Sequence, residues 1–150
     1  MSANQMTLYH YWRSSCSWRV RWGFAHKKQT LNYQAIDLLK NEQQSPEYLK
    51  KNPSGLVPSL NINQSYVGES LAILEWLEER HPNPPLLPQD SFARLQVRQL
   101  CYTIMSGIQP LQNLSAQKKH AQEKEKQHAY ARFWIEKGFR TYETLSLIHI

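Results

Sequence analysis

Cysteine and glycine are scarce in this 150-residue chain, which has two cysteines and five glycines. Cys16 and Cys101 lie far apart and no C-x-x-C pair occurs, so the chain lacks the disulfide framework that staples small secreted proteins. A reducing cytoplasm is therefore the simplest setting. The low glycine content, together with only eight prolines, also excludes collagen-like and low-complexity chains.

Long apolar runs are missing as well. The longest, such as Leu71-Ala72-Ile73-Leu74, are far too short to cross a bilayer, and the first residues, MSANQM, lack the charged and apolar stretches of a secretory signal. Apolar residues nevertheless make up 41% of the chain, which argues against disorder, and the length suffices to bury a core without disulfides. We therefore expect a globular protein with no membrane partner.

Positive charge exceeds negative charge, with 18 Lys and Arg against 12 Asp and Glu, a net charge of +6. This balance admits nucleic acid, a membrane surface or small anionic ligands, and charge alone does not choose among them. The most polar segment, residues 117–128, has Glu123 and Glu125 within its positive run and no interleaved aromatic residue, so we expect a solvated helix face or connecting loop there rather than a nucleic-acid site. No metal-ligand spacing joins His10, His26 and His81, and no metal site is predicted.

Proline clusters at residues 81–90, where four of the eight prolines lie. Because proline fixes φ and removes a backbone donor, neither a helix nor a central strand is expected to pass through this run. We predict a linker at residues 82–88, between an N-terminal domain of residues 1–81 and a helical domain of residues 89–150.

The N-terminal domain alternates between strand and helix patterns. The expected strands span residues 6–12, 31–36, 57–62 and 65–67, with a hairpin turn at Asn63-Gln64, and the expected helices span residues 15–28, 46–51 and 69–80. The resulting order is β-α-β-α-β-β-α.

Apolar periodicity orients two of these helices. In the first, the inner face is expected to hold Val20, Phe24 and Trp18. In the last, the inward residues are Ile73, Leu74, Trp76 and Leu77, and the outward residues are Glu75, Glu78 and Glu79.

The helical domain is expected to begin with a cap at Asp90-Ser91. The apolar face of its first helix runs through Val97, Cys101, Ile104 and Ile108, so Cys101 is expected to be a buried core residue. Pro110 should break or kink that helix. Apolar residues return from Tyr130 onward, at Phe133, Trp134, Ile135, Phe139 and Tyr142.

The segment Arg13-Ser14-Ser15-Cys16-Ser17-Trp18-Arg19-Val20-Arg21 follows an expected strand and opens an expected helix. Unpaired N–H groups and a partial positive charge at a helix N-terminus favour an anion, including a thiolate. A helix cap needs one serine, whereas this segment offers three hydroxyls, a thiol and flanking arginines, so we interpret it as a site. Arg19 and Arg21 lie inside the helix, where plain solvation is the alternative.

Two further segments combine turn chemistry with polar groups. Pro58 opens a strand after Asn52-Pro53-Ser54-Gly55, which suggests a sharp, cis turn that would aim the Val57 backbone at a ligand; an ordinary edge-strand proline is the alternative. Gly68-Glu69-Ser70 precedes the last helix of the domain. Ser70 is either its N-cap or a partner for a carboxylate, with Glu69 receiving an ammonium group.

Together these segments resemble the N-terminal domain of glutathione transferases, which has a thioredoxin-like fold. The run from Ser14 to Arg21 is similar to the S-S-C-x-x-R-V-R signature of the zeta class, the maleylacetoacetate isomerases, and residues 86–90 (LLPQD) and 107–115 (GIQPLQNLS) also resemble that class. The resemblance runs from about Leu8 to about Leu145. It implies an α/β thioredoxin-like domain followed by an incomplete all-α domain.

Carried over residue by residue, the resemblance implies a glutathione site. The implied catalytic residues, which surround the glutathione sulfur, are Ser14, Ser15 and Cys16. The implied glutathione-binding set is Ser14, Ser15, Cys16, Ser17, Trp18, Arg19, Gln43, Val57, Glu69, Ser70, Gln109, Asn113, Leu114 and Ser115. Relatives often carry glutamine where this chain has Glu69.

The implied reaction is the glutathione-dependent cis–trans isomerisation of maleylacetoacetate or maleylpyruvate, dianionic small molecules, by a cytoplasmic homodimer, as in tyrosine breakdown. Cys16 leaves an alternative open, because a helix N-terminus should lower its thiol pKa and make it a nucleophile. That would suit a thiol transferase that forms mixed disulfides. A glutathione-binding fragment without activity is the non-enzyme alternative.

The last six residues, Leu145-Ser146-Leu147-Ile148-His149-Ile150, do not resemble the family, whose helical domain continues for several more helices. They match the translation of a transposon-end adapter used in sequencing libraries. We expect them to be an artefact at the end of a truncated reading frame; a chance Leu/Ile-rich helix end is the alternative.

Overall fold

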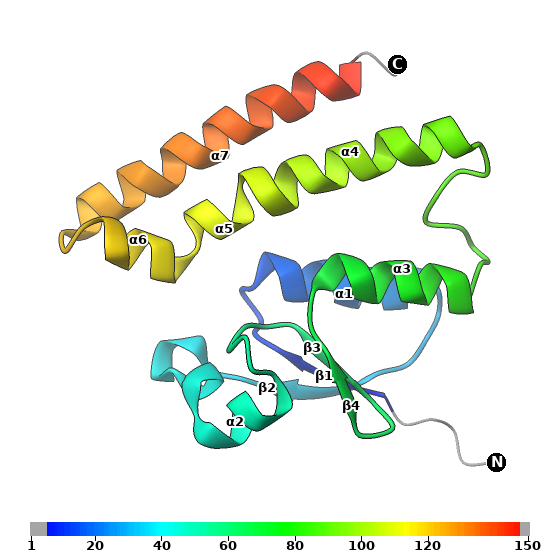
Figure 1. The fold of residues 1–150 in the computed structure, drawn as a ribbon, viewed down its shortest axis with the longest axis horizontal. Helices are drawn as coiled ribbons and strands as arrows, with labels where there is room; N and C mark the ends of the chain where they lie inside the picture. Colours follow the sequence, from blue (N-terminus) through cyan, green and yellow to red (C-terminus); the bar gives the residue numbers. More distant parts are fainter. Residues whose placement is uncertain (1–5, 148–150) are drawn as a thin grey trace. The chain divides into compact units, whose positions relative to one another are not determined.

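The computed structural model describes residues 6–147 (Figure 1). The chain forms two compact units that meet between Leu86 and Leu87, a point inside the proline-rich segment, and each unit is described by itself. Within the described residues, the helices are all too short or too polar to cross a membrane.

The first unit is built on a four-stranded sheet with the order β2-β1-β3-β4 (Figure 1). Strand β1 pairs in parallel with β2 and antiparallel with β3, and β3 pairs antiparallel with β4. The elements in chain order are β1 (Thr7–His10), α1 (Ser15–His26), β2 (Asn32–Ala35), η1 (Leu38–Lys40), η2 (Glu42–Gln44), α2 (Pro46–Lys51), β3 (Ser59–Ile62), β4 (Ser65–Val67) and α3 (Ser70–Arg80). The predicted order β-α-β-α-β-β-α is confirmed, with two short 3-10 helices added, and the fold is thioredoxin-like.

The core of the first unit lies between the sheet and the helices α1 and α3. Its fully buried cluster consists of Leu8, Val20, Phe24, Leu60, Ile73 and Leu77. Gly23 lets the two helices approach closely, because a Cβ at this position would overlap the Leu74 side chain. Trp18, expected on the inner face of α1, is instead 52% exposed, so that expectation was wrong.

Glu78 is a second correction, because it is buried rather than turned to solvent. It forms an ion pair with Lys27, which is only 2% exposed at the end of α1, and its Oε2 accepts a 3.0 Å hydrogen bond from the Leu86 N–H. A buried carboxylate needs such partners to offset its lost hydration. Glu78 thus joins α1, α3 and the segment after α3.

The second unit is helical, with α4 (Ser91–Gly107), α5 (Gln109–Gln112), α6 (Leu114–His120) and α7 (Lys124–Leu147). The Asp90 side chain caps α4 by accepting from the Ala93 N–H at 2.8 Å, and Pro110 falls in the first turn of α5, so both predictions are confirmed. Residues 117–128 lie at the end of α6, in the connection and at the start of α7, and are mostly exposed, as expected.

Few side chains are buried in the second unit. Helix α4 packs on α7 but contains no buried residue, and Gly138 of α7 faces Ile108, which lies between α4 and α5. Cys101 is only half-buried, so the expectation of a core cysteine was wrong. Of the six terminal residues that we expect to be an artefact, Leu145–Leu147 continue α7 and residues 148–150 lie outside the described residues.

Candidate functional site

The start of α1 carries the densest group of predicted site residues. Ser14 is the N-cap, and its Oγ accepts from the Ser17 N–H at 3.1 Å. A serine hydroxyl that accepts in this way keeps its own proton for another partner. Capping and ligand binding are therefore compatible at Ser14. Ser15 is exposed at the first helical position, beside this hydroxyl in the chain.

Ser17 and Trp18 lie differently from their neighbours. Ser17 is fully buried, and its Oγ accepts from the Tyr11 N–H at 3.4 Å, so it braces the loop between β1 and α1 from within. Trp18 is exposed on α1 and stacks at a tilt against Trp22, with ring centroids 4.8 Å apart. The structure therefore places Trp18, but not Ser17, where a ligand can reach it.

Cys16 is half-buried, and its burial raises the pKa of the thiol. The nearby Arg19 guanidinium and hydrogen bonds with Ser15 and Ser70 pull the pKa down, while the Glu69 carboxylate adds to the rise. The expectation of a lowered pKa was wrong, because the loss of hydration outweighs the favourable charges at the helix end. At neutral pH Cys16 is therefore mainly a thiol, which makes it a poor nucleophile.

Arg19 connects α1 to the beginning of α3. Its Nη1 donates to Ser70 Oγ at 2.6 Å, so the idea of a merely solvated arginine was wrong here. Arg21 likewise has a partner, because its Nη2 donates to the Trp12 carbonyl at 3.1 Å. These contacts fix the direction of both guanidinium groups.

The N-cap of α3 is Glu69 rather than Ser70, which corrects the capping interpretation of Ser70. Glu69 has a φ of 60°, a left-handed conformation that is costly for a residue with a side chain. Its side chain makes no capping hydrogen bond and is exposed. Ser70 is the first helical residue and is only 3% exposed.

Two loops supply the remaining predicted residues of the first unit. The Val57–Pro58 peptide bond is cis, as the sequence suggested. The Oε1 atom of Gln43, in η2, is buried and has no hydrogen-bond partner among the described residues. Such an acceptor calls for a donor from outside the chain. The Gln44 amide donates to the Gly55 carbonyl at 3.2 Å, which holds these two loops together.

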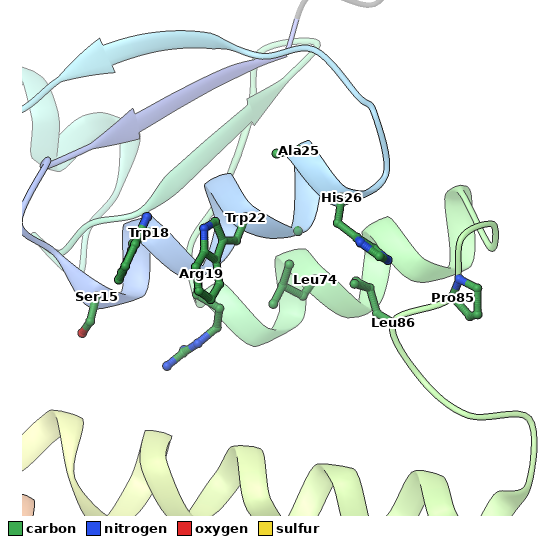
Figure 2. Close-up of a pocket in the computed structure, with 10 residues that line it drawn as sticks. Ser15, Trp18, Arg19, Trp22, Ala25, His26, Leu74, Pro85 and Leu86 are labelled. Atoms are coloured by element: carbon green, nitrogen blue, oxygen red, sulfur yellow. The ribbon is translucent and has the colours of Figure 1, made fainter.

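A pocket of about 800 Å³ runs along α1 (Figure 2). Successive turns of α1 contribute Ser15, Trp18, Arg19, Trp22 and His26, α3 contributes Leu74, and the segment after α3 contributes Pro85 and Leu86. Trp22, His26 and Leu74 were not among the residues predicted for a site. The four-residue spacing of Trp18, Trp22 and His26 along one side of α1 indicates the part of this set on that helix, whereas Leu74 comes from α3 and has no such signal.

Gln109, Asn113, Leu114 and Ser115 belong to the second unit. Asn113 caps α6, since its Oδ1 accepts from the Ala116 N–H at 2.9 Å and from the Ser115 hydroxyl at 2.6 Å. Gln109 opens α5, and Leu114 is 49% exposed. Their contribution to a glutathione site stays a prediction.

Comparison with known proteins identifies relatives. The family model described as glutathione S-transferase, N-terminal domain, matches residues 8–85. Maleylacetoacetate isomerase of Dictyostelium discoideum is 48% identical over 150 residues, which cover 97% of this chain and 68% of that protein. The holo structure of maleylpyruvate isomerase, a bacterial zeta-class glutathione S-transferase, superposes with a TM-score of 0.88 at 34% identity, covering 92% of this chain and 67% of that chain.

A third relative was solved with ligands in its active site. This maleylacetoacetate isomerase of Anaeromyxobacter dehalogenans, with bound dicarboxyethyl glutathione and citrate, superposes with a TM-score of 0.82 at 39% identity and covers 97% of this chain and 66% of its own. The chain therefore spans about two thirds of the length of the relatives it matches, from 61% to 68% for the first three curated ones.

Proposed function

Since the chain belongs to the glutathione S-transferase family, in the zeta class of maleylacetoacetate isomerases, we propose that it carries out glutathione-dependent cis–trans isomerisation. The substrate is maleylacetoacetate or maleylpyruvate, a cis-enedioic acid. The observation that carries the proposal is the Ser14 hydroxyl at the start of α1: its oxygen accepts from the Ser17 N–H, which leaves its proton to donate to an anion.

The chemistry requires a temporary loss of double-bond character. The glutathione thiolate adds to the conjugated alkene, a carbon–sulfur bond forms, and the π electrons move into the neighbouring carbonyl as an enolate. The former double bond is now single and rotates. The enolate then re-forms the double bond in the trans arrangement and expels the thiolate, so glutathione is regenerated. Dicarboxyethyl glutathione, bound by one relative, is a thioether of the type this addition produces.

The residues at the start of α1 supply what this sequence of steps needs. Ser14, with the protonated Cys16 and the end of the helix, stabilises the glutathione thiolate at neutral pH. Gln43, Val57, Glu69 and Ser70 hold the peptide part of glutathione. The unpartnered Oε1 of Gln43 accepts from a ligand N–H, and the exposed Glu69 carboxylate receives the ligand ammonium.

The two negative charges of the substrate match the positive charge near the start of α1. Arg13 is exposed beside the serines, with its guanidinium 5.7 Å from the Trp12 ring, and the whole chain carries a net charge of +6. This positive field attracts carboxylates. We also propose that the protein acts in the cytoplasm as a homodimer, with no nucleic-acid partner.

A thiol transferase that uses Cys16 is the competing enzyme function. It requires a thiolate at Cys16, and the raised pKa of this thiol argues against it. A glutathione-binding module without activity is the second alternative. It predicts binding of glutathione with no turnover of any cis-enedioic acid.

An assay of maleylacetoacetate isomerisation with substoichiometric glutathione separates these functions. We expect many turnovers per glutathione, a loss of about 100-fold or more in Ser14→Ala, and retained activity in Ser14→Thr and Cys16→Ser. Ser45→Ala is the matched control, because Ser45 caps α2 by accepting from the Tyr48 N–H at 3.2 Å, away from the serines of α1. Activity that survives in Ser14→Ala and disappears in Cys16→Ser would contradict the proposal.

A further inference from the structure

The hydrogen bond between Arg19 and Ser70 joins residues that are 51 positions apart in the chain. It connects the second turn of α1 with the first residue of α3, and its length of 2.6 Å makes it short for a nitrogen donor. A guanidinium group has donors only, so the Ser70 oxygen must be the acceptor. The chemistry of the two groups therefore fixes the direction of the bond.

This direction constrains the Ser70 proton. One lone pair of Oγ is occupied by Arg19, and the hydroxyl has to donate to another group. Ser70 is only 3% exposed, so few positions are open to that proton. Its surroundings include the N-terminal turn of the 11-residue helix α3, which favours an anion, and Cys16, whose thiol hydrogen-bonds with Ser70.

We propose that Arg19 is a positioning residue for the ligand carboxylate: it holds the Ser70 hydroxyl so that this hydroxyl donates to the α-carboxylate of the glutathione γ-glutamyl group. The inference rests on the proposed function, in which Ser70 holds that part of glutathione. Donation by a cation also polarises the Ser70 O–H and strengthens it as a donor. Arg19 acts through Ser70 and does not touch the carboxylate itself.

Arg21 offers a matched control on the same helix. It carries the same charge two residues further on and donates to the Trp12 carbonyl, not to Ser70. Replacing either arginine with methionine removes one positive charge and keeps a long apolar side chain. A general effect of charge would appear in both variants, whereas a positioning effect would appear only at Arg19.

The test compares two ligands by calorimetry with the whole chain. The first is glutathione. The second is 4-aminobutyryl-cysteinyl-glycine, which retains the ammonium group, the thiol and the glycine carboxylate but lacks the α-carboxylate. We expect Arg19→Met to weaken glutathione binding about tenfold while it changes binding of the second ligand less than twofold. Arg21→Met should change neither, and Arg19→Lys, which retains a donor, should give intermediate affinity for glutathione.

A double-mutant cycle completes the experiment. Ser70→Ala in the Arg19→Met background should cause no further loss of glutathione affinity, because the two residues act on one interaction. Equal weakening of both ligands in Arg19→Met, equal losses in Arg19→Met and Arg21→Met, or additive losses with Ser70→Ala would overturn the inference and leave the proposed function intact. A wild-type chain that binds no glutathione would overturn both.

Discussion

In the first unit six side chains, from Leu8 to Leu77, form a fully buried cluster, whereas among the hydrophobic residues described in the second unit only Ile108 and Ala131 are buried. The second unit has no shortage of apolar residues. It leaves several of them more than 40% exposed, namely Phe92, Leu95, Tyr102, Leu114, Phe133 and Phe139. A domain is stabilised by the apolar surface that it removes from water, not by the apolar residues that it contains.

The predicted site residues of the first unit lie on elements that its core holds in place. The start of α1, the start of α3 and the two loops around η2 and Pro58 all belong to the unit that has its own core. The core residues Val20 and Phe24 continue the same helix that begins at Ser15. Side chains on such an element are held in place by packing, which is what a preorganised binding site requires.

The largest expected effect comes from truncating a core side chain of the first unit. Phe24→Ala should lower the free energy of unfolding by about 3–5 kcal/mol, because it removes a fully buried ring and leaves a cavity. Phe133→Ala in the second unit, where the ring is 54% exposed, should cost less than about 1 kcal/mol. Urea unfolding followed by circular dichroism measures both. Equal losses would refute the contrast between the two units.

The second prediction compares two ion pairs. Lys27→Met should cost about 3 kcal/mol, because it leaves the Glu78 carboxylate buried without its cation. Lys126→Met should cost less than about 1 kcal/mol, because the pair of Lys126 and Glu123 is exposed to solvent. The Leu86 amide donates to Glu78, so hydrogen exchange at this amide reports locally on the loss of the Lys27–Glu78 ion pair. An unchanged exchange rate there in Lys27→Met would show that the pair does not hold this segment.

The third prediction uses two glycines of the second unit. A Cβ at Gly138 would overlap the Ile108 side chain, so Gly138→Ala should destabilise the fold by about 1–3 kcal/mol. A Cβ at Gly107 meets nothing within 4 Å, so Gly107→Ala should stabilise it by up to about 1 kcal/mol through helix propensity. Thermal unfolding distinguishes the signs. Similar shifts for both variants would mean that the contact between Gly138 and Ile108 is not tight.

The smallest effect concerns Cys16. Because burial raises its thiol pKa, the thiolate fraction at neutral pH is below that of a free thiol, and labelling should rise only at higher pH. Iodoacetamide labelling of a Cys101→Ser variant from pH 6 to pH 10, beside N-acetylcysteine, measures this. In Arg19→Met the rise should move to still higher pH, since the cation that favours the thiolate is gone. If Cys16 were labelled at a lower pH than N-acetylcysteine, the raised pKa of its thiol would be contradicted.

Local chemistry made much of the first unit predictable from the sequence. The helix Pro46–Lys51 has the predicted bounds, because Ser45 and Pro46 are a cap and a first-turn residue. The predicted turn at Asn63-Gln64 has positive φ at both residues, as a tight hairpin requires. Each of these features depends on neighbours in the chain, and no distant partner is involved.

Most of the errors involve partners that are distant in the sequence or the degree of burial, and one involves an unusual backbone conformation. Glu78 follows an outward pattern on α3, yet Lys27, 51 residues away, draws it inward. The pKa of Cys16 depends on how much water reaches the thiol, which the helix position does not reveal. Ser70 has the sequence of a cap, but the left-handed backbone of Glu69 shifts the helix start by one residue. Long-range packing decides the first two cases, and the backbone conformation of an adjacent residue decides the third.

The most direct test of the account is a calorimetric titration of the 150-residue chain with glutathione. We predict saturable binding with one glutathione per chain, and loss of most of the affinity in Ser70→Ala but not in Ser45→Ala. Absence of binding at millimolar glutathione, or binding that survives unchanged in Ser70→Ala, would contradict a glutathione site held by the first unit.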